Sequence, residues 1–259
     1  MGDWNTLHIF NDRDFYDRLV PDFKDRGAMF KHHMDSLLGK YILGNNDNSE
    51  TRTLHLVDLC RQLKPDFKIH GAYYKIESRQ KKPTEDYKDF ISKRVEDGHD
   101  FLRVNASVIE DLNLLLTLVI FAECGAFNPH LILGRRTFSS NIKARPGSLA
   151  ENIIQQTWYH PLGSIYTTGS GPMNWISYDE LNLLWLDKHN LHVPPEGSEQ
   201  YLQEFLEFTE LALQHKCGFI SVTNVNETML CRIENPGLKI DVDPRAKGWE
   251  SVITYTSKY

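Results

Sequence analysis

The sequence predicts an α+β fold that is mostly helical, with a small antiparallel sheet. Three observations lead to this expectation: helical periodicity fills most of the first three quarters of the 259 residues, strand-like alternation gathers after residue 218, and one short strand pattern stands near the N-terminus. Because helices and strands are segregated along the chain, the pattern favours α+β over alternating βαβ units. The N-terminal strand could join the C-terminal strands in one sheet.

The N-terminal segment begins with a strand over Thr6–Phe10, followed by a helix that Asn11 can cap. We expect this helix to reach Val20, because Pro21 either ends it or starts the next turn. A wide apolar stripe then predicts a helix over 30–42. Its stripe consists of Phe30, His33, Met34, Leu37, Leu38, Tyr41 and Ile42. Three further segments follow: helices over 49–63 and 83–95, and an ambiguous strand or helix over 67–76.

A central buried helix is expected over Asn105–Gly125. Its run from Leu112 to Ala122 carries no charge and presents apolar side chains on nearly every side, which is typical of a buried helix. The run is shorter than the roughly 18 residues that a membrane-spanning helix needs. Asn105 can cap the first turn, and Gly125 can end the helix in a left-handed conformation.

Capping boxes mark two helices of the second half. Ser148 pairs with Glu151, and Ser177 pairs with Glu180, each at the three-residue spacing of this motif. A longer amphipathic helix is predicted over Glu199–His215. Its water-facing residues are expected to be Glu204, Glu207, Glu210 and Gln214.

The C-terminal quarter holds the clearest strand patterns. Phe219–Val222 and Met229–Ile233 alternate around the turn sequence NVNE and predict a hairpin. Trp249–Tyr255 also alternates and could add a third strand.

None of the four cysteines has the C-x-x-C spacing of a zinc ribbon or a thioredoxin-type redox site. Cys60 and Cys124 lie on apolar helical faces, where buried free thiols are expected. Cys217 and Cys231 flank the predicted hairpin and could meet across it, so whether they pair stays open.

The composition is that of an ordinary soluble protein, with 41% hydrophobic and 25% charged residues and a net charge of −6. A mildly acidic chain is poorly suited to coat nucleic acid or a membrane with its whole surface. The N-terminus shows no signal-peptide pattern, so we expect a cytoplasmic protein. We expect a single domain over 1–259, with one weak boundary candidate near 194–197.

The region 134–178 is the strongest candidate for a functional site. Between Cys124 and Tyr178 the chain carries four bases and one acid, a net charge of +3, while the rest carries −9. Guanidinium groups bind phosphate or carboxylate in bidentate fashion, and a helix start is a further natural anion site. The anion-binding candidates are Arg135, Arg136, Lys143, Arg145 and Ser148. The simpler interpretation is a surface segment whose bases pair with the acidic remainder of the protein.

Aromatic residues and one histidine accompany these bases. Their rings could stack on a base or a sugar, and they belong to Trp158, Tyr159, Tyr166 and Trp175. His160 is the candidate acid–base group, although a single histidine in a loop is usually just solvated.

Asp241 and Asp243 are the weak candidates for a metal site. Two residues apart on a strand, their carboxylates would project from one face and could hold Mg²⁺ or Mn²⁺. Acids beside Pro236 and Pro244 more often solvate a turn, which is the interpretation we favour. No metal or other cofactor is therefore predicted.

The sequence contains no Walker lysine motif, dinucleotide fingerprint, H-E-x-x-H motif or G-x-S-x-G nucleophile elbow. We therefore favour a cytoplasmic protein-binding module of inhibitor or immunity type, which would dock on a basic protein partner through acidic helical faces. Those faces are formed by Asp12, Asp14, Asp17, Asp22 and Asp25, and by Glu199, Glu204, Glu207 and Glu210. The alternative is an enzyme or ligand-binding protein acting on a phosphorylated or nucleotide-like small molecule through region 134–178.

Overall fold

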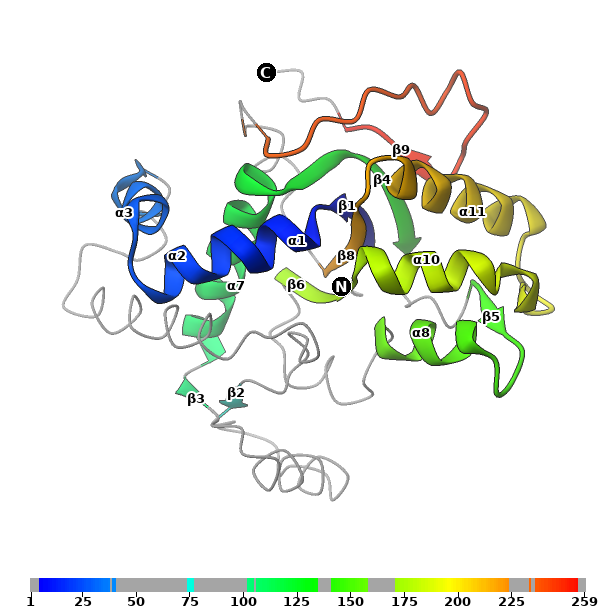
Figure 1. Cartoon of the computed structure of the whole chain (residues 1–259), viewed down its shortest axis with the longest axis horizontal. Coiled ribbons are helices and arrows are strands. Elements are labelled where there is room, and N and C mark those ends of the chain that lie inside the picture. Colours follow the sequence, from blue (N-terminus) through cyan, green and yellow to red (C-terminus); the bar gives the residue numbers. More distant parts are fainter. Residues whose placement is uncertain are drawn as a thin grey trace.

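The computed structural model describes residues 5–37, 39–40, 74–76, 102–104, 106–134, 141–157, 171–223, 233 and 236–255. These residues form helices and an antiparallel sheet, so the predicted α+β class is confirmed (Figure 1). The helices predicted over 49–63 and 83–95 and most of the hairpin strand over 229–233 lie outside the described residues. No described helix is both long and apolar enough to span a membrane.

A five-stranded sheet organises the described residues. Its strand pairs are all antiparallel. In spatial order the strands are β6 (Gly171–Ile176), β8 (Gly218–Thr223), β1 (Asn5–Phe10), β4 (Gly125–Gly134) and β9 (Val252–Ile253). Two small sheets stand apart: parallel β2 (Tyr74–Ile76) with β3 (Leu102–Val104), and antiparallel β5 (Lys143–Ala144) with β7 (Leu191–His192). The N-terminal strand thus lies in the middle of the large sheet.

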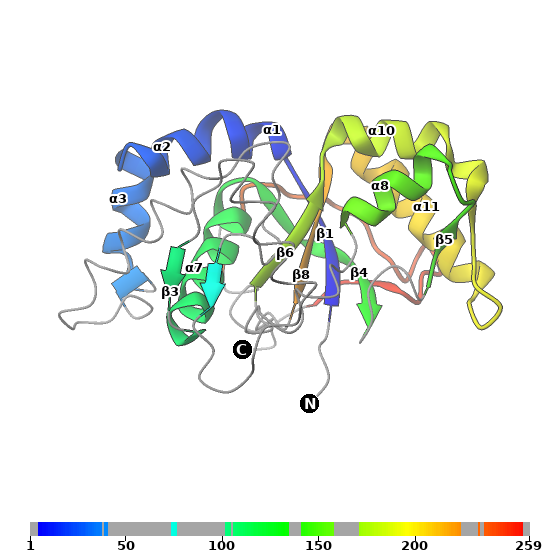
Figure 2. The same ribbon diagram turned by 90° about the horizontal axis from the view of Figure 1, so that it is seen from below.

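Helices cover both faces of this sheet, which makes three layers (Figure 2). Alternate residues of β1 point to opposite faces. Leu7 and Ile9 pack in the core cluster with residues of α10 and α11, whereas His8 and Phe10 meet Phe121 and Phe15 on the other face. The helices of the first face are α8 (Leu149–Thr157), α10 (Tyr178–Leu186) and α11 (Glu199–Gln214). The second face carries α7 (Ala106–Glu123) and the N-terminal helical run.

The predicted hairpin between Phe219–Val222 and Met229–Ile233 is wrong. Strand β8 pairs with β1 along one edge and with β6 along the other. Because a strand has only two hydrogen-bonding edges, no edge of β8 is left for the segment that follows it. The third expected strand is shortened to β9, and it pairs with β4 at His130 and Leu131.

The N-terminal helical run consists of α1 (Asp12–Asp14), the π-helical η1 (Phe15–Leu19) and α2 (Val20–Lys24). Asn11 caps it as expected, because its side chain accepts the backbone N–H of Asp14 at 3.0 Å. Pro21 does not end the run; the wider π turns lie just before it. A regular α-helix would place the proline ring against the carbonyl four residues back, so the π segment relieves that clash.

Helix α3 (Ala28–Asp35) is shorter than the helix over 30–42 that the apolar stripe predicts. It ends at Ser36, and Leu37 is 91% exposed instead of packing inward. Among the described stripe residues, Phe30 is buried and His33 and Met34 are half-buried. Leu38, Tyr41 and Ile42 lie outside the described residues.

Helix α11 matches its predicted bounds, but Glu204 does not face water. The segment after Pro244 covers this side of α11, and the Glu204 side chain is only 3% exposed. Its carboxylate accepts the backbone N–H groups of Glu250 and Ser251 at 2.9 and 2.6 Å, which compensates its burial. Glu207 accepts the indole N–H of Trp249. Helical periodicity could not reveal this contact, because the covering segment lies far along the chain.

Candidate functional site

The structure describes three of the five predicted anion-binding residues. Lys143 and Arg145 are exposed, and Ser148 is half-buried. Arg135, Arg136 and the acid–base candidate His160 lie outside the described residues, as do Trp158, Tyr159 and Tyr166.

The two described cations stand at the junction of β5 and α8. Strand β5 pairs with β7, so that Lys143 is opposite His192 and Ala144 is opposite Leu191. The backbone N–H of Arg145 donates to the carbonyl of Asn190 at 2.9 Å, which fixes the start of the turn. Ala144 is buried while Lys143 and Arg145 are exposed, so this short sheet holds both charged side chains at the surface.

The start of α8 already binds carboxylates of the protein itself. Ser148 accepts the N–H of Glu151 at 3.1 Å, as its capping box predicts, and the Glu151 carboxylate accepts the N–H of Gly147 at 2.7 Å. Asp187 accepts the N–H of Ala150 at 2.8 Å, and this hydrogen bond lowers the pKa of its carboxyl group below the usual range. An external anion at this helix start would have to displace Asp187.

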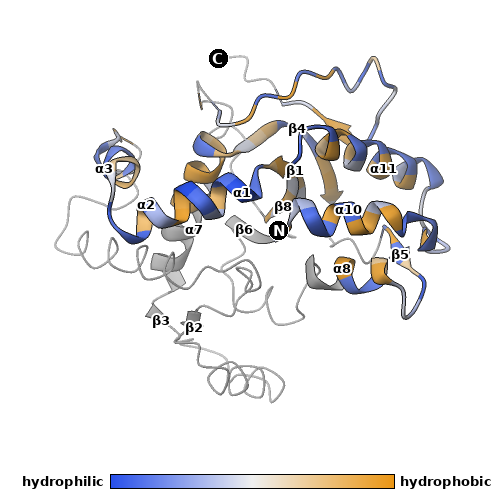
Figure 3. Cartoon of the chain, viewed as in Figure 1, coloured by the Kyte–Doolittle hydropathy of each residue, from blue (hydrophilic) through white to orange (hydrophobic). Residues whose placement is uncertain are grey.

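Three exposed leucines lie beside this junction on α8 and α10. Leu149 and Leu183 are each 43% exposed, and Leu186 is 75% exposed. Asp187, which follows Leu186, binds Ala150, which follows Leu149, so the two helices meet here. Figures 1 and 2 agree in placing α8, β5 and the C-terminal end of α10 together, and Figure 3 shows apolar residues along both helices.

We name this surface the α8–α10 corner and define it by Lys143, Arg145, Leu149, Leu183 and Leu186. Lys188, two residues after Leu186, places its ammonium 3.3 Å from the centre of the Trp185 ring. The corner therefore combines basic and apolar side chains. The Glu151 and Asp187 carboxylates at the α8–α10 junction accept backbone N–H groups.

No motif singles out the three leucines in the sequence, although α10 carries a signal. Its sequence YDELNLLWL has apolar residues on nearly every side, which is more than one buried face needs. Leu181 and Leu184 point into the core, and Leu183 and Leu186 are left outside. Leu149 gave no signal beyond its place just after the Ser148 cap.

Trp175 does not offer a stacking surface. It is 1% exposed and packs edge-on against Phe10 and Phe15, with ring centroids 6.4 and 5.5 Å away. Strand β6 faces the helical run over 12–24 at this point, so the indole fills the core between them. The prediction of a ligand-stacking role for Trp175 is wrong.

Asp241 and Asp243 are both exposed and lie outside any regular strand. Asp243 accepts the backbone N–H of Arg245 at 2.9 Å, and its carbonyl accepts the N–H of Lys247. This is the turn-forming role that we favoured over metal binding. Among the residues that the structure describes, no three His, Cys, Asp or Glu side chains come together as a metal site would require.

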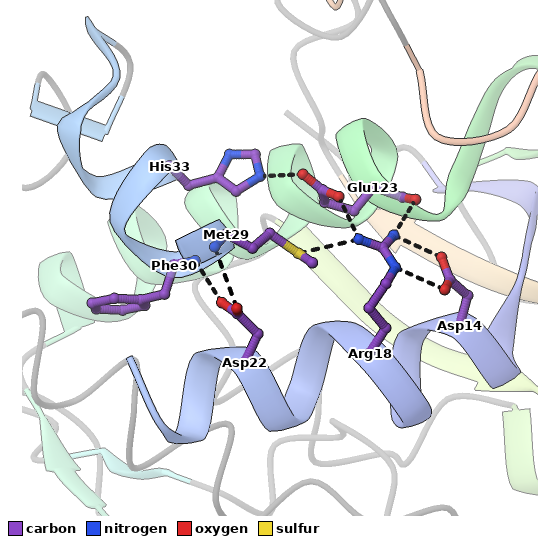
Figure 4. Close-up of polar contacts among 7 residues, drawn as sticks. All are labelled: Asp14, Arg18, Asp22, Met29, Phe30, His33 and Glu123. Atoms are coloured by element: carbon purple, nitrogen blue, oxygen red, sulfur yellow. Dashed lines mark hydrogen bonds and ion pairs between the residues drawn. The ribbon is translucent and has the colours of Figure 1, made fainter. Parts of the chain in front are cut away.

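A polar network that the sequence did not indicate joins the N-terminal helices to α7 (Figure 4). The Arg18 guanidinium donates to the Asp14 carboxylate at 2.8 and 2.7 Å and to the Glu123 carboxylate at 2.9 Å. His33 lies 2.8 Å from the other Glu123 oxygen. Burial alone would raise the pKa of Glu123, but the hydrogen bonds from Arg18 and His33 hold it below its usual range.

Several acids of the predicted acidic faces have structural partners. Asp12 accepts the N–H of Tyr178 at 3.1 Å, and Asp22 accepts the N–H groups of Met29 and Phe30 at the start of α3. With Asp14 and Glu204 also engaged, the carboxylates at the surface are fewer than the sequence suggests. The α8–α10 corner is therefore the better-defined surface feature.

No known protein family, curated protein or solved structure matches this chain.

Proposed function

We propose that this protein is a protein-binding module and that the α8–α10 corner is its contact surface. The observation that carries the proposal is the exposure of Leu149, Leu183 and Leu186 on two adjoining helices. Single exposed apolar residues are ordinary on a protein surface, but neighbouring ones mark interaction sites. Leu186, at 75% exposed, would be the central anchor.

The charges of the corner indicate the chemistry of the partner. Lys143 and Arg145 are exposed beside the leucines, while the carboxylates of Glu151 and Asp187 each accept a backbone N–H group of the protein itself. A partner that presents apolar side chains flanked by carboxylates would bury the leucines and meet the cations. This differs from the basic partner expected from the acidic helical faces, since several of those acids serve the fold.

A module of inhibitor or immunity type acts only by binding its partner. It therefore needs a contact surface, and the α8–α10 corner would provide one. A reducing, cytoplasmic location belongs to the same proposal. The two described cysteines, Cys124 and Cys217, are buried and carry free thiols, and disulfides are rare in such a compartment.

The alternative is a site for a phosphorylated or nucleotide-like molecule at the same junction. Lys143 and Arg145 would bind its phosphate, with Ser148 at the helix start, and the sequence adds Arg135, Arg136 and His160. Because Asp187 occupies the start of α8, a phosphate would gain less there than at an open helix terminus. Protein binding is therefore the function that we favour.

The test is quantitative capture of partners from cell lysate with immobilised protein. We expect a partner whose capture falls at least about tenfold when Leu183 and Leu186 are both replaced by Glu. Leu37→Glu is the matched control, because Leu37 is equally apolar, 91% exposed and far from the corner. Equal melting temperatures of the variants would show that the loss is not unfolding.

Charge is tested separately by Lys143→Glu with Arg145→Glu. Capture should then fall and its salt dependence should weaken, since the attraction of the cations is screened by salt. If no captured protein depends on Leu183 and Leu186, or if Leu37→Glu reduces capture equally, the corner is not the contact surface.

A further inference from the structure

Two histidines lie side by side in the interior of the sheet, and neither has a role in the α8–α10 corner. His8 of β1 is directly opposite His130 of β4, with their rings stacked 5.1 Å apart. The two residues are 1% and 0% exposed. Phe121 of α7 packs edge-on against His8, and the Phe127 ring stacks on both imidazoles.

Both rings donate to one carbonyl group. Nδ1 of His8 lies 3.1 Å from the Phe127 carbonyl oxygen, and Nδ1 of His130 lies 3.2 Å from the same atom. A carbonyl only accepts, so each Nδ1 carries a proton. Nε2 of neutral His8 then accepts from the Thr6 hydroxyl at 2.8 Å. A second proton on His8 would reverse this hydrogen bond, with the Thr6 hydroxyl then accepting, and would place a charge beside the other imidazole.

The shared carbonyl belongs to a bulge in β4. His8 pairs with His130 and Ile9 pairs with Ala126, so Phe127, Asn128 and Pro129 have no partner on β1. Such a bulge turns the backbone groups of its extra residues out of the regular pattern. The carbonyl of Phe127 turns towards the histidines.

The same bulge holds the C-terminal segment 249–255, which we call the strap. The Asn128 side chain donates to the Tyr255 carbonyl at 2.9 Å and accepts the Tyr255 N–H at 2.8 Å. The Phe127 ring also packs edge-on against Tyr255. Besides these contacts, β9 pairs with His130 and Leu131, and the backbone N–H of Ile132 donates to the Ser251 carbonyl at 2.8 Å. The strap is therefore fastened to β4 at the residues that surround the histidine pair.

We propose that the His8–His130 pair is an acid-sensitive catch: protonation of either ring displaces the β4 bulge and releases the strap from β4. Burial lowers the pKa of both rings, with that of His130 at about 4. Both imidazoles are therefore neutral near pH 7, and the strap stays bound to β4. On the described elements that face the pair, the neighbouring groups are Thr6, Ile220, Phe121, Phe127 and, beyond Phe127, Tyr255. None of these carries a negative charge near neutrality that would stabilise an imidazolium.

The strap has a second attachment, at α11, and the experiment must separate the two. Glu204 accepts the N–H groups of Glu250 and Ser251. Asparagine is the matched replacement for each histidine, because its amide nitrogen stands near the position of Nδ1 and can donate to Phe127 without titrating.

The experiment is amide hydrogen exchange of the strap between about pH 7 and about pH 5, corrected for the intrinsic pH dependence of exchange. In the wild-type protein we expect protection of 249–255 to fall at least about tenfold, while that of α11 is kept. The His8→Asn, His130→Asn protein should keep its strap protection over the same range. An equal fall in this variant, or no fall in the wild type, overturns the proposal.

A second measurement applies if the double variant does not fold. Deuterium exchange at the imidazole C2 position of the wild-type protein reports the titration of each histidine. We expect both rings to titrate below the ordinary histidine value of about 6.5 and together with the loss of strap protection. Titration of either ring near the ordinary value of about 6.5, with the strap still protected, overturns the proposal as well.

Discussion

Glu204 of α11 accepts the backbone N–H of Ser251 at 2.6 Å, although 47 residues separate them along the chain. Together with the N–H of Glu250, this contact places a buried carboxylate between a helix and the C-terminal segment. A buried carboxylate that serves two backbone donors belongs to the fold and is not available for docking.

We expect Glu204→Ala to lower the free energy of unfolding by about 2 kcal/mol, because it removes the shared acceptor of two partly buried N–H groups. Urea denaturation measures this loss. Glu210→Ala on the exposed side of the same helix is the control and should change stability by less than about 0.5 kcal/mol. Similar losses in both variants would mean that Glu204 stabilises α11 only through helix propensity.

The ion pairs of Arg18 and Arg13 should differ in their contribution to the free energy of unfolding. Arg18 bridges Asp14 and Glu123 with three short contacts, whereas Arg13 meets Asp179 at 3.1 Å where both side chains are more than half exposed. We expect Arg18→Ala to cost about 1–2 kcal/mol and Arg13→Ala less than about 0.5 kcal/mol. Denaturant midpoints of the two variants provide the comparison, and equal midpoints would contradict it.

Stability should fall on mild acidification because of the buried histidines. The pKa of His130 is lowered to about 4 in the folded protein by burial, while the unfolded chain has the ordinary value of about 6.5. The unfolded state therefore binds the proton first. The contribution of His130 is complete above about pH 6.5 and is lost through about pH 4, and it amounts to roughly 3 kcal/mol.

His8 adds to this dependence in the same direction, because its pKa is also lowered by burial and by His130. Urea denaturation at a series of pH values would show the slope. His130→Asn should flatten it between about pH 6.5 and about pH 4, and an unchanged slope would assign the acid sensitivity to carboxylates instead.

Asp187 decides how well the start of α8 can bind an external anion. Asp187→Ala removes the carboxylate from the N–H of Ala150. Without an added anion, this variant should therefore melt at a lower temperature than the wild-type protein. Phosphate or sulfate should then raise the melting temperature of the variant more than that of the wild type, since Lys143 and Arg145 stand nearby. No added response to phosphate would remove the anion-binding alternative for this junction.

Sequence patterns predicted structure correctly where the contact involved joins residues only a few positions apart. The capping box of Ser177 with Glu180, the Asn11 cap and the bounds of α11 all depend on hydrogen bonds or periodicity inside short segments. The same holds for the turn at Asp243. Such features depend little on what packs against them.

Predictions failed where a distant segment decides the environment. The sequence predicts a solvated Glu204, but the strap covers it. The sequence predicts Trp175 as a loop aromatic, but it lies on β6 and packs against Phe15. No local pattern marked Leu183 and Leu186 as surface residues, because α10 has more apolar sides than the core covers.

The sequence by itself determined the α+β class, the helix starts and the cationic character of the chain around Lys143 and Arg145, because these follow from local hydrogen bonding and composition. Only the tertiary structure decided that β8 lies between β1 and β6, that His8 stacks on His130, and that Asp187 binds the start of α8. Strand partners and buried polar pairs are chosen by contacts between segments far apart in the chain, whose relative burial no local pattern encodes.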